Sequence, residues 1–255
     1  MTSVVAGARM SGTHGDAMIF VHGVGSTAAI WDRQLEAFAD EYRCFAVELR
    51  GNGASKPDPD PASITREGFV QDVLAVADAA QALRFHFVGC SLGGVVGFEL
   101  HRIAPERLLS LTIVGSFAKY EDGEGYARGV VEAVREAGGM PQFAQARAAR
   151  LGLQPGPRTD ETISQMACKS VSCYLASTGA TWTGDYRAEL AGIRVPTLVM
   201  YGERDTVAPA AYAQEIAGSI PGARLEVVHD AGHVANADAP EAFNAVLHKF
   251  LEGVR

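Results

Sequence analysis

One short stretch of the chain, residues 85–100, restricts its fold more than any other. The apolar run Phe85–Val88 is typical of a buried strand, and the apolar spacing after residue 94 is typical of a buried helix. Between them lies the pattern Gly-x-Ser-x-Gly at Gly89–Gly93. A sharp turn from strand to helix needs small residues around the serine, because a Cβ there collides with the adjoining strand and helix. The pattern predicts that Ser91 lies at the tip of such a turn, in the position of a nucleophile.

The alternative is that the pattern arises by chance, because the chain contains 28 glycines. A motif predicts a function only in the right structural context. That context is an alternation of strands and helices. Continuous apolar strands separated by helices predict an α/β fold whose mostly parallel sheet has helices on both faces. We expect strands at residues 17–21, 44–47, 85–88, 108–114, 196–202 and 225–228, and helices at 31–38, 69–83, 92–104, 209–218 and 243–251.

The alternation fails between Ser116 and Leu190. No convincing strand occurs there, and Ala-rich pieces at residues 129–137, 143–151 and 162–176 predict helices instead. We therefore expect one core domain made of residues 1–115 and 191–255. Residues 116–190 are expected to be a helical insertion.

Composition excludes several classes of function. The 255 residues carry a formal net charge of -8 and no dense run of Lys or Arg, which argues against a nucleic-acid partner. No secretory signal and no apolar stretch of membrane-spanning length is recognisable, so we expect a cytoplasmic protein without a membrane partner. The four cysteines lack C-x-x-C spacing, which indicates free thiols and neither a disulfide framework nor a metal site.

A serine hydroxyl needs a base to remove its proton, and the base works best when a carboxylate orients it. Asp205 and His233 each follow a predicted strand, and the carboxyl ends of parallel strands form the ligand sites of α/β folds. The order Ser91, Asp205, His233 predicts a catalytic triad. His229 is the rival base and Glu203 the rival acid, but both lie nearer to their strands.

The negative oxygen of a tetrahedral intermediate needs two N–H donors. The N–H of Leu92, directly after the nucleophile, is one candidate. The N–H of Val24, in the turn Gly23-Val24-Gly25 after the strand at 17–21, is the other. A plain tight turn or a phosphate loop would also explain these glycines. The phosphate loop is the weaker explanation, because this stretch lacks the third glycine and no Walker lysine follows it. We expect His22 to be a structural hydrogen-bonding residue.

Together these features resemble the α/β-hydrolase superfamily over nearly the whole chain. Within it, the sequence looks most like the 3-oxoadipate enol-lactonases and neighbouring carboxylesterases. The residues that carry the resemblance are His22-Gly23 with Trp31, Leu49-Arg50-Gly51 through Ser55, Gly89–Gly93, Pro105-Glu106-Arg107, Pro196–Asp205, Gly232–Asn236 and Pro240–Phe243.

The resemblance implies that residues 116–190 form a lid over the site, and it also reveals departures. Members of the superfamily commonly have Asp where this chain has Glu48, and His where it has Asn52. Carbon–carbon bond hydrolases of this fold often have Trp after the catalytic histidine, where Val234 stands. Dehalogenases and epoxide hydrolases have Asp as the nucleophile, which Ser91 excludes. The segment before residue 17 is shorter than is usual in the family, so we expect the family's first strand to be missing.

The expected activity is hydrolysis of an ester or lactone of a small organic acid through an acyl-enzyme, with no cofactor and no metal. A carbon–carbon bond hydrolase of a vinylogous diketone would use the same triad. A ligand receptor or signalling module with little turnover would also retain the fold. The sequence leaves the acyl chain of the substrate and the oligomeric state open.

We expect the insertion to determine which substrate is bound. Four of its side chains are able to line an apolar pocket with polar ends: Tyr120, Tyr126, Tyr174 and Trp182. Its basic residues either hold a substrate carboxylate or are solvated surface charges. For any one of them, a solvated surface charge is the commoner role. These basic residues include Arg128, Arg147, Arg150 and Lys169.

Overall fold

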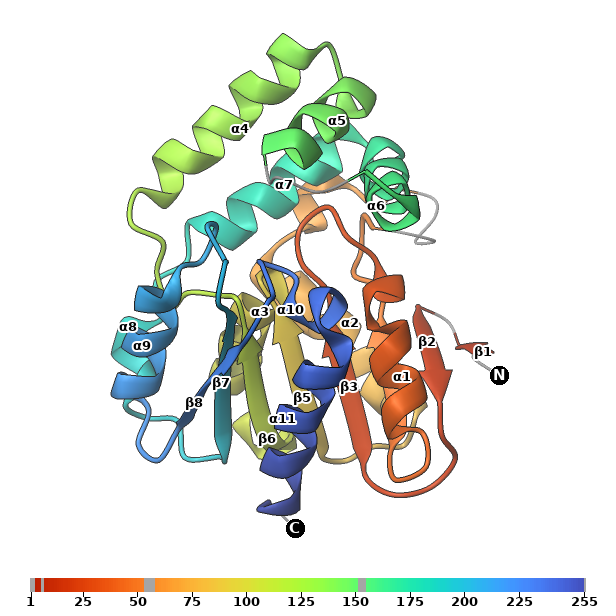
Figure 1. Ribbon diagram of the computed structural model, residues 1–255, viewed down its shortest axis with the longest axis vertical. Coiled ribbons are helices and arrows are strands. Elements are labelled where there is room, and N and C mark those ends of the chain that lie inside the picture. The colour runs from red at the N-terminus through yellow and green to blue at the C-terminus, as the bar shows by residue number, and fades with distance from the viewer. Residues whose placement is uncertain (1–2, 6, 53–57, 151–154, 255) are drawn as a thin grey trace.

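The computed structural model describes residues 3–5, 7–52, 58–150 and 155–254 (Figure 1). Ser55, named above, and the last residue of the predicted helix at 143–151 lie outside these ranges. The strands are β1 (Ser3–Val5), β2 (Ala8–Ser11), β3 (Ala17–Val21), β4 (Arg43–Val47), β5 (Phe85–Cys90), β6 (Leu108–Val114), β7 (Thr197–Gly202) and β8 (Arg224–Val228). The helices outside the insertion are α1 (Asp32–Phe38), α2 (Arg66–Ala79), α3 (Leu92–Ile103), α9 (Ala210–Ser219), α10 (Ala235–Asp238) and α11 (Pro240–Glu252).

The described strands form one sheet in the order β1-β2-β4-β3-β5-β6-β7-β8. The six strands from β3 to β8 run parallel, whereas β1 and β2 pair antiparallel at one edge. The predicted α/β fold with a mostly parallel sheet is confirmed. The expectation that the first strand is missing is wrong, because β1 and β2 precede β3 in the sheet. They are only three and four residues long, too short to show a clear apolar pattern in the sequence.

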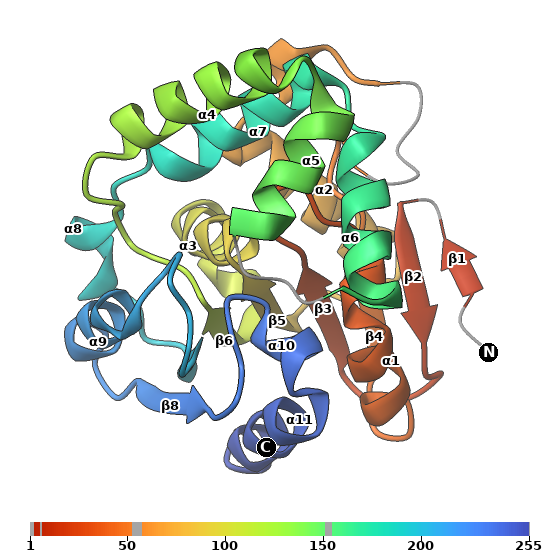
Figure 2. The ribbon, with the colours of Figure 1, turned by 45° about the horizontal axis from the view of Figure 1, so that its top comes forward.

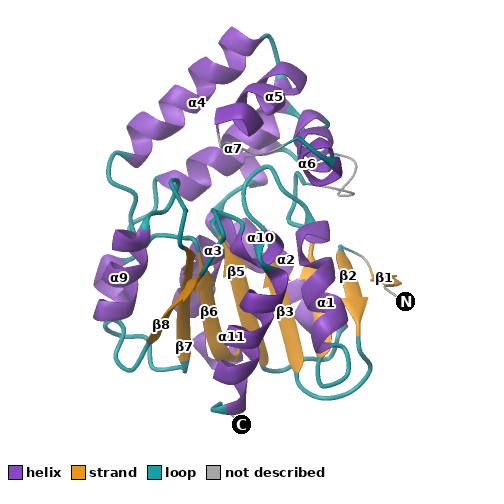
Figure 3. Cartoon of the chain, in the orientation of Figure 1, coloured by secondary structure: helices purple, strands orange, loops and turns teal. Residues whose placement is uncertain are grey.

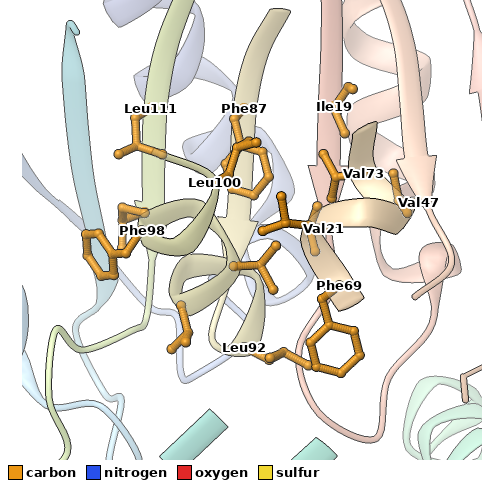
Figure 4. Close-up of a cluster of buried hydrophobic side chains, with 14 of the residues drawn as sticks. Ile19, Val21, Val47, Phe69, Val73, Phe87, Leu92, Phe98, Leu100 and Leu111 are labelled. Carbon is orange, nitrogen blue, oxygen red and sulfur yellow. The ribbon is translucent and has the colours of Figure 1, made fainter. Parts of the chain in front are cut away.

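Alternate side chains of each strand pack on opposite faces of the sheet. In β3, Ile19 and Val21 belong to a core beneath α2 and α3, whereas Met18 and Phe20 belong to a second core beneath α1 and α11. Figure 1 shows these two pairs of helices on opposite sides of the sheet, and Figure 4 shows side chains of the first core. Both faces of the central strands are buried, as their continuous apolar runs predicted.

Helix α2 differs from its predicted extent of residues 69–83. It begins at Arg66, because the hydroxyl of Thr65 caps it by accepting a hydrogen bond from the N–H of Gly68 at 3.0 Å. It ends at Ala79, and Gln81 then has a φ of +52°, which no helix continues. Leu83 is 84% exposed and lies outside the helix. Because Leu83 is apolar, the sequence pattern included it in the helix, and the predicted helix therefore ended too late.

Between β6 and β7 the chain forms α4 (Gly123–Ala137), α5 (Met140–Arg150), α6 (Pro157–Ala167), α7 (Val171–Trp182) and the short α8 (Arg187–Leu190). The predicted helix at 162–176 is in fact split between α6 and α7. The split occurs where Ser170 caps α7 by accepting a hydrogen bond from the N–H of Cys173 at 3.5 Å. Helices α4 to α7 lie over the end of the sheet at which β6 leads into α4 (Figures 2 and 3).

Two further features concern the described residues. None of their helices is both long enough and apolar enough to cross a membrane. All four cysteines are free, and only Cys168 is exposed, so the prediction of free thiols is confirmed.

Strand β5 lies so close to the start of α3, and α3 so close to β3, that no side chain fits between their backbones. A Cβ on Gly89 would lie 2.2 Å from the carbonyl oxygen of Gly93, and a Cβ on Gly93 would lie 2.2 Å from that of Val21. Both obstacles are backbone atoms, which cannot rotate away as a flexible side chain does. The turn at Ser91 therefore depends on these two glycines.

We expect Gly93→Ala to lower the free energy of unfolding by at least ~2 kcal/mol, because strand or helix must shift to admit the methyl group. Gly129→Ala is the matched control, since a Cβ on Gly129 in α4 would meet no heavy atom within 4 Å. That substitution should leave stability unchanged or raise it by ~0.5–1 kcal/mol. Urea denaturation measures both values, and equal effects of the two substitutions would contradict the close approach at Gly93.

Candidate active site

Ser91 lies in the turn between β5 and α3 in a backbone conformation that few residues adopt. Its φ is +55° and its ψ is -114°, outside the regions that L-residues normally occupy. The N–H of Ser91 donates to the carbonyl of Val114 at 2.9 Å. The hydroxyl of Ser116 donates to the carbonyl of Ser91 at 2.8 Å. Such strain persists only where the surroundings fix it, and it is concentrated at functional sites.

Asp205 and His233 lie in contact, on the loops that follow β7 and β8. Nδ1 of His233 is 2.9 Å from Oδ2 of Asp205. The other carboxylate oxygen accepts hydrogen bonds from the N–H groups of Val207 at 2.8 Å and Ala208 at 2.9 Å. The Asp205 side chain is fully buried and the His233 side chain is 16% exposed. The carboxylate is thus held at both oxygens, and it fixes the ring so that Nε2 points away from it.

The ends of β5, β6 and β7 bring these residues toward Ser91. A Cβ on Gly115, just after β6, would lie 3.1 Å from Oδ2 of Asp205 and 3.4 Å from Nδ1 of His233. The next residue, Ser116, bonds the Ser91 carbonyl. Sγ of Cys90, the residue before Ser91, is 3.9 Å from the carbonyl oxygen of His233. Ser91, Asp205 and His233 therefore surround one short segment at the end of β6.

The two rival residues lie elsewhere. Nδ1 of His229 is 3.4 Å from Oε1 of Glu203, and these side chains are 71% and 51% exposed. Glu203 also accepts a hydrogen bond from the N–H of Asp230, which together with His229 lowers the pKa of its carboxyl. The rival acid and base therefore pair with each other at the surface.

The turn after β3 lies against Ser91. A Cβ on Gly23 would be 3.1 Å from Cβ of Ser91 and 3.6 Å from its Oγ. In the described part of the chain, the N–H groups of Val24 and Leu92 have no hydrogen-bond acceptor. Leu92 is the first residue of α3, where backbone N–H groups lack partners within the helix. Two backbone donors near Ser91, one in the turn after β3 and one at the start of α3, are therefore without an acceptor among the described residues.

His22 holds this turn as a neutral ring. Its Nδ1 is 2.8 Å from the carbonyl oxygen of Gly23, and its Nε2 is 3.3 Å from the N–H of Leu49. One nitrogen donates and the other accepts, which only the neutral tautomer can do. Complete burial lowers the pKa of His22 to about 3. The 3.5 Å approach of Glu48 to Nε2 is therefore no ion pair at neutral pH.

Aromatic side chains cover the region beside Ser116. Trp182 of α7 lies 4.1 Å from the ring of Tyr126 and 4.9 Å from that of Phe117, measured between ring centroids. The aromatic cluster consists of Phe117, Tyr120, Tyr126, Trp182 and Tyr212.

Tyr174, the remaining aromatic residue named above, lies beside the turn after β3. A Cβ on Gly25 would be 3.1 Å from Cε2 of Tyr174 and 2.8 Å from Cε of Met166. The side chains of the insertion thus contact the turn that contains Val24.

Gly115 and Ser116 are site residues that the sequence analysis missed. Their signal was available, since small and polar residues directly after a predicted strand are the kind of evidence that identified Asp205. They were overlooked because neither side chain titrates. Ser116 acts on the backbone of Ser91, which only the structure reveals.

Comparisons with known proteins show which proteins this chain resembles. A sequence model of the alpha/beta hydrolase family matches residues 18–246. The chain is 31% identical over 243 residues to 3-oxoadipate enol-lactonase 2 of Acinetobacter baylyi, covering 92% of this chain and 89% of that protein. It is 32% identical over 255 residues to a putative carbamate hydrolase RutD of Azorhizobium caulinodans, covering 92% and 91%. A hydrolase structure from Pseudomonas aeruginosa superposes with a TM-score of 0.87 at 31% identity, covering 96% and 93%.

The burial of His22 predicts a specific dependence of stability on pH. Its pKa is about 3 in the folded chain, against 6.5 in the unfolded chain. Below pH 6.5 the unfolded chain takes up a proton that the folded chain excludes, so stability is lost as the pH falls toward 3. Through His22, the free energy of unfolding falls by about 1.4 kcal/mol for each pH unit in this range.

Urea unfolding between pH 6.5 and 4 measures this loss. His22→Gln is the control, because an amide also donates and accepts but does not titrate over this range. We expect the variant to be less stable at pH 6.5 and to show a shallower decline below it. Parallel pH profiles of the two proteins would show that His22 titrates in the folded state as it does in the unfolded one.

Proposed function

The chain belongs to the alpha/beta hydrolase family, and from this premise we propose that it is a serine hydrolase that cleaves an ester or lactone of a small organic acid. Its relatives named as an enol-lactonase and a carbamate hydrolase support hydrolysis of an acyl group. The observation that carries the proposal is the 2.9 Å contact between Asp205 and His233 beside the strained Ser91.

In the proposed mechanism, Oγ of Ser91 attacks the carbonyl carbon of the substrate while Nε2 of His233 takes up the hydroxyl proton. Asp205 holds the ring and stabilises its positive form. The carbonyl oxygen becomes negative, and the N–H groups of Val24 and Leu92 donate to it, each worth ~3 kcal/mol of barrier. His233 returns the proton to the leaving oxygen, and water then releases the acyl group from Ser91 by the same steps. The residues need no metal and no cofactor for this chemistry.

We further propose that residues 1–115 and 191–255 are the hydrolase core and that residues 116–190 are a lid. Helices α4 to α7 lie over the strand ends that carry the proposed triad (Figure 2). Met166 and Tyr174 contact Gly25, beside the proposed donor Val24. Ser91 itself is only 6% exposed. A lid in this position excludes water and limits the substrate to a small molecule.

Ser91→Ala tests the nucleophile. We expect kcat to fall on the order of a millionfold, because members of a triad act as a unit. Stability should change by less than ~1 kcal/mol, since no core volume is lost. Stopped-flow measurement with para-nitrophenyl acetate should show a burst for the native protein and none for the variant.

If the Ser91→Ala variant retained a tenth of the native kcat, Ser91 would not be the nucleophile. A native protein that is never acylated at Ser91 would favour a receptor on the same fold.

A second test concerns the base. We expect His233→Ala to abolish turnover, because Nε2 of His233 accepts the Ser91 proton. The matched control is His229→Ala, which removes an exposed histidine paired with Glu203 and should leave kcat/KM unchanged. If the two variants exchanged these results, His229 would be the base.

A further inference from the structure

A buried network of hydrogen bonds joins the loop of His233 to the helices that follow β3. Nδ2 of Asn236 donates to the carbonyl oxygen of Ile30 at 2.8 Å, and Nε2 of Gln34 donates to the carbonyl oxygen of Asn236 at 3.1 Å. Nε2 of Gln34 also donates to Oδ1 of Asn244 at 2.8 Å. We call these residues the amide network. They are Ile30 in the short 3₁₀ helix η1 (Ala28–Trp31), Gln34 in α1, Asn236 in α10 and Asn244 in α11.

Two side chains of this network, Gln34 and Asn236, are completely buried. Among the described residues, Oδ1 of Asn236 has no hydrogen-bond partner, and a buried polar atom without a partner costs free energy. Apolar side chains at both positions would fill the same space without that cost. Packing alone therefore does not account for these two amides.

One end of the network reaches His233 through α10, which begins just after it. The N–H groups of Ala237 and Asp238 both donate to the carbonyl oxygen of Val234 at 2.9 Å. On the other side of His233, the N–H of Gly232 donates to Oδ2 of Asp238 at 2.9 Å. Both sequence neighbours of His233 are therefore hydrogen-bonded to α10, so a shift of α10 moves the ring.

The other end of the network continues from the turn that contains the proposed donor Val24. The hydroxyl of Thr27 caps η1, because it accepts a hydrogen bond from the N–H of Ala29 at 3.3 Å. Helix η1 therefore starts almost directly after the turn. Its carbonyl group at Ile30 is the acceptor that Asn236 holds.

The sheet does not join these two segments. Strands β5, β6 and β7 lie between β3 and β8, so the loops after β3 and β8 leave strands that are not paired with each other. Outside the sheet, α10 packs against η1, and α11 packs against α1. Figure 1 shows α1, α10 and α11 on one side of the sheet. The amide network supplies hydrogen bonds between segments that the sheet leaves apart.

We propose that Asn236 and Gln34 are positioning residues for the hydrolysis proposed above, and this inference rests on that function. They hold His233, the proposed base, at a fixed place relative to Val24, the proposed donor to the oxyanion. Both groups must act on one substrate carbonyl in the same step, and a misplacement of about 1 Å can cost on the order of 100-fold in rate. Because both amides are buried, they act through the segments that they hold and do not contact the substrate.

The experiment breaks the network in two ways. Asn236→Leu removes the amide that bonds Ile30, and Gln34→Met removes the second amide with little change in volume, which preserves a test if Asn236→Leu does not fold. The matched control is Ser110→Ala, which removes a buried hydrogen bond to His86 of 2.8 Å, near the end of β5 that is remote from Ser91. Urea unfolding measures the stability of each variant. The kinetics use para-nitrophenyl acetate, at a temperature at which circular dichroism shows every variant to be folded.

We expect Asn236→Leu to lower kcat by about 10- to 100-fold and to change KM by less than about twofold, because it disturbs the geometry of the reaction and not the binding of the substrate. Gln34→Met should lower kcat by only about 3- to 10-fold, since the bond from Asn236 to Ile30 remains. Ser110→Ala should lower stability and leave kcat and KM unchanged. Native kcat in both network variants, a loss that lies in KM alone, or an equal loss in Ser110→Ala would overturn the inference and leave the serine mechanism intact.

A second measurement does not depend on turnover. Proton NMR detects the ring N–H of His233 that is bonded to Asp205, and the loss of this signal in His233→Ala assigns it. We expect Asn236→Leu to shift or broaden the signal and Ser110→Ala to leave it unchanged. If the native protein is never acylated at Ser91, the proposed function fails, and the signal then decides whether the network positions His233. A signal that is unchanged in both network variants overturns the inference.

Discussion

The close approach of three backbone segments around Ser91 is the constraint on which the rest of the structure depends. Strand β5 must turn into α3 within one residue, and Gly89 and Gly93 leave no room for a Cβ against neighbouring carbonyl oxygens. The cost is a serine with a φ of +55°. The surrounding sheet offsets this strain through the bonds from Ser91 to Val114 and from Ser116 to Ser91.

The order of the strands then determines which loops reach that serine. Strands β5, β6, β7 and β8 are neighbours in the sheet, so residues that follow their carboxyl ends meet although they are far apart in the sequence. Asp205 and His233 lie on two of these loops and contact each other at 2.9 Å. Glu203 and His229 lie on the same loops and instead pair at the surface. A shift of two to four residues along a loop thus separates a buried pair from an exposed one.

The insertion contributes Phe117, Tyr120, Tyr126 and Trp182 to the aromatic cluster, to which the core adds Tyr212. Its helices share a small apolar core of their own, which Val24 contacts from the side of the sheet. The turn proposed to bind the oxyanion is therefore packed against the insertion as well as held by His22. Movement of these helices would act directly on that turn. Arg147 of α5 is buried in the same layer of helices.

The sequence by itself determined the α/β fold, the turn at Ser91 and the positions of Asp205 and His233 after strands, because apolar periodicity and glycine requirements are local properties of the chain. It did not predict the short strands β1 and β2, nor the end of α2, where the apolar residue Leu83 extended the pattern beyond the helix. Only the tertiary structure distinguished a buried Arg147 from an exposed Arg128. Two arginines in similar helices look alike in a sequence, and their difference arises from what packs around them.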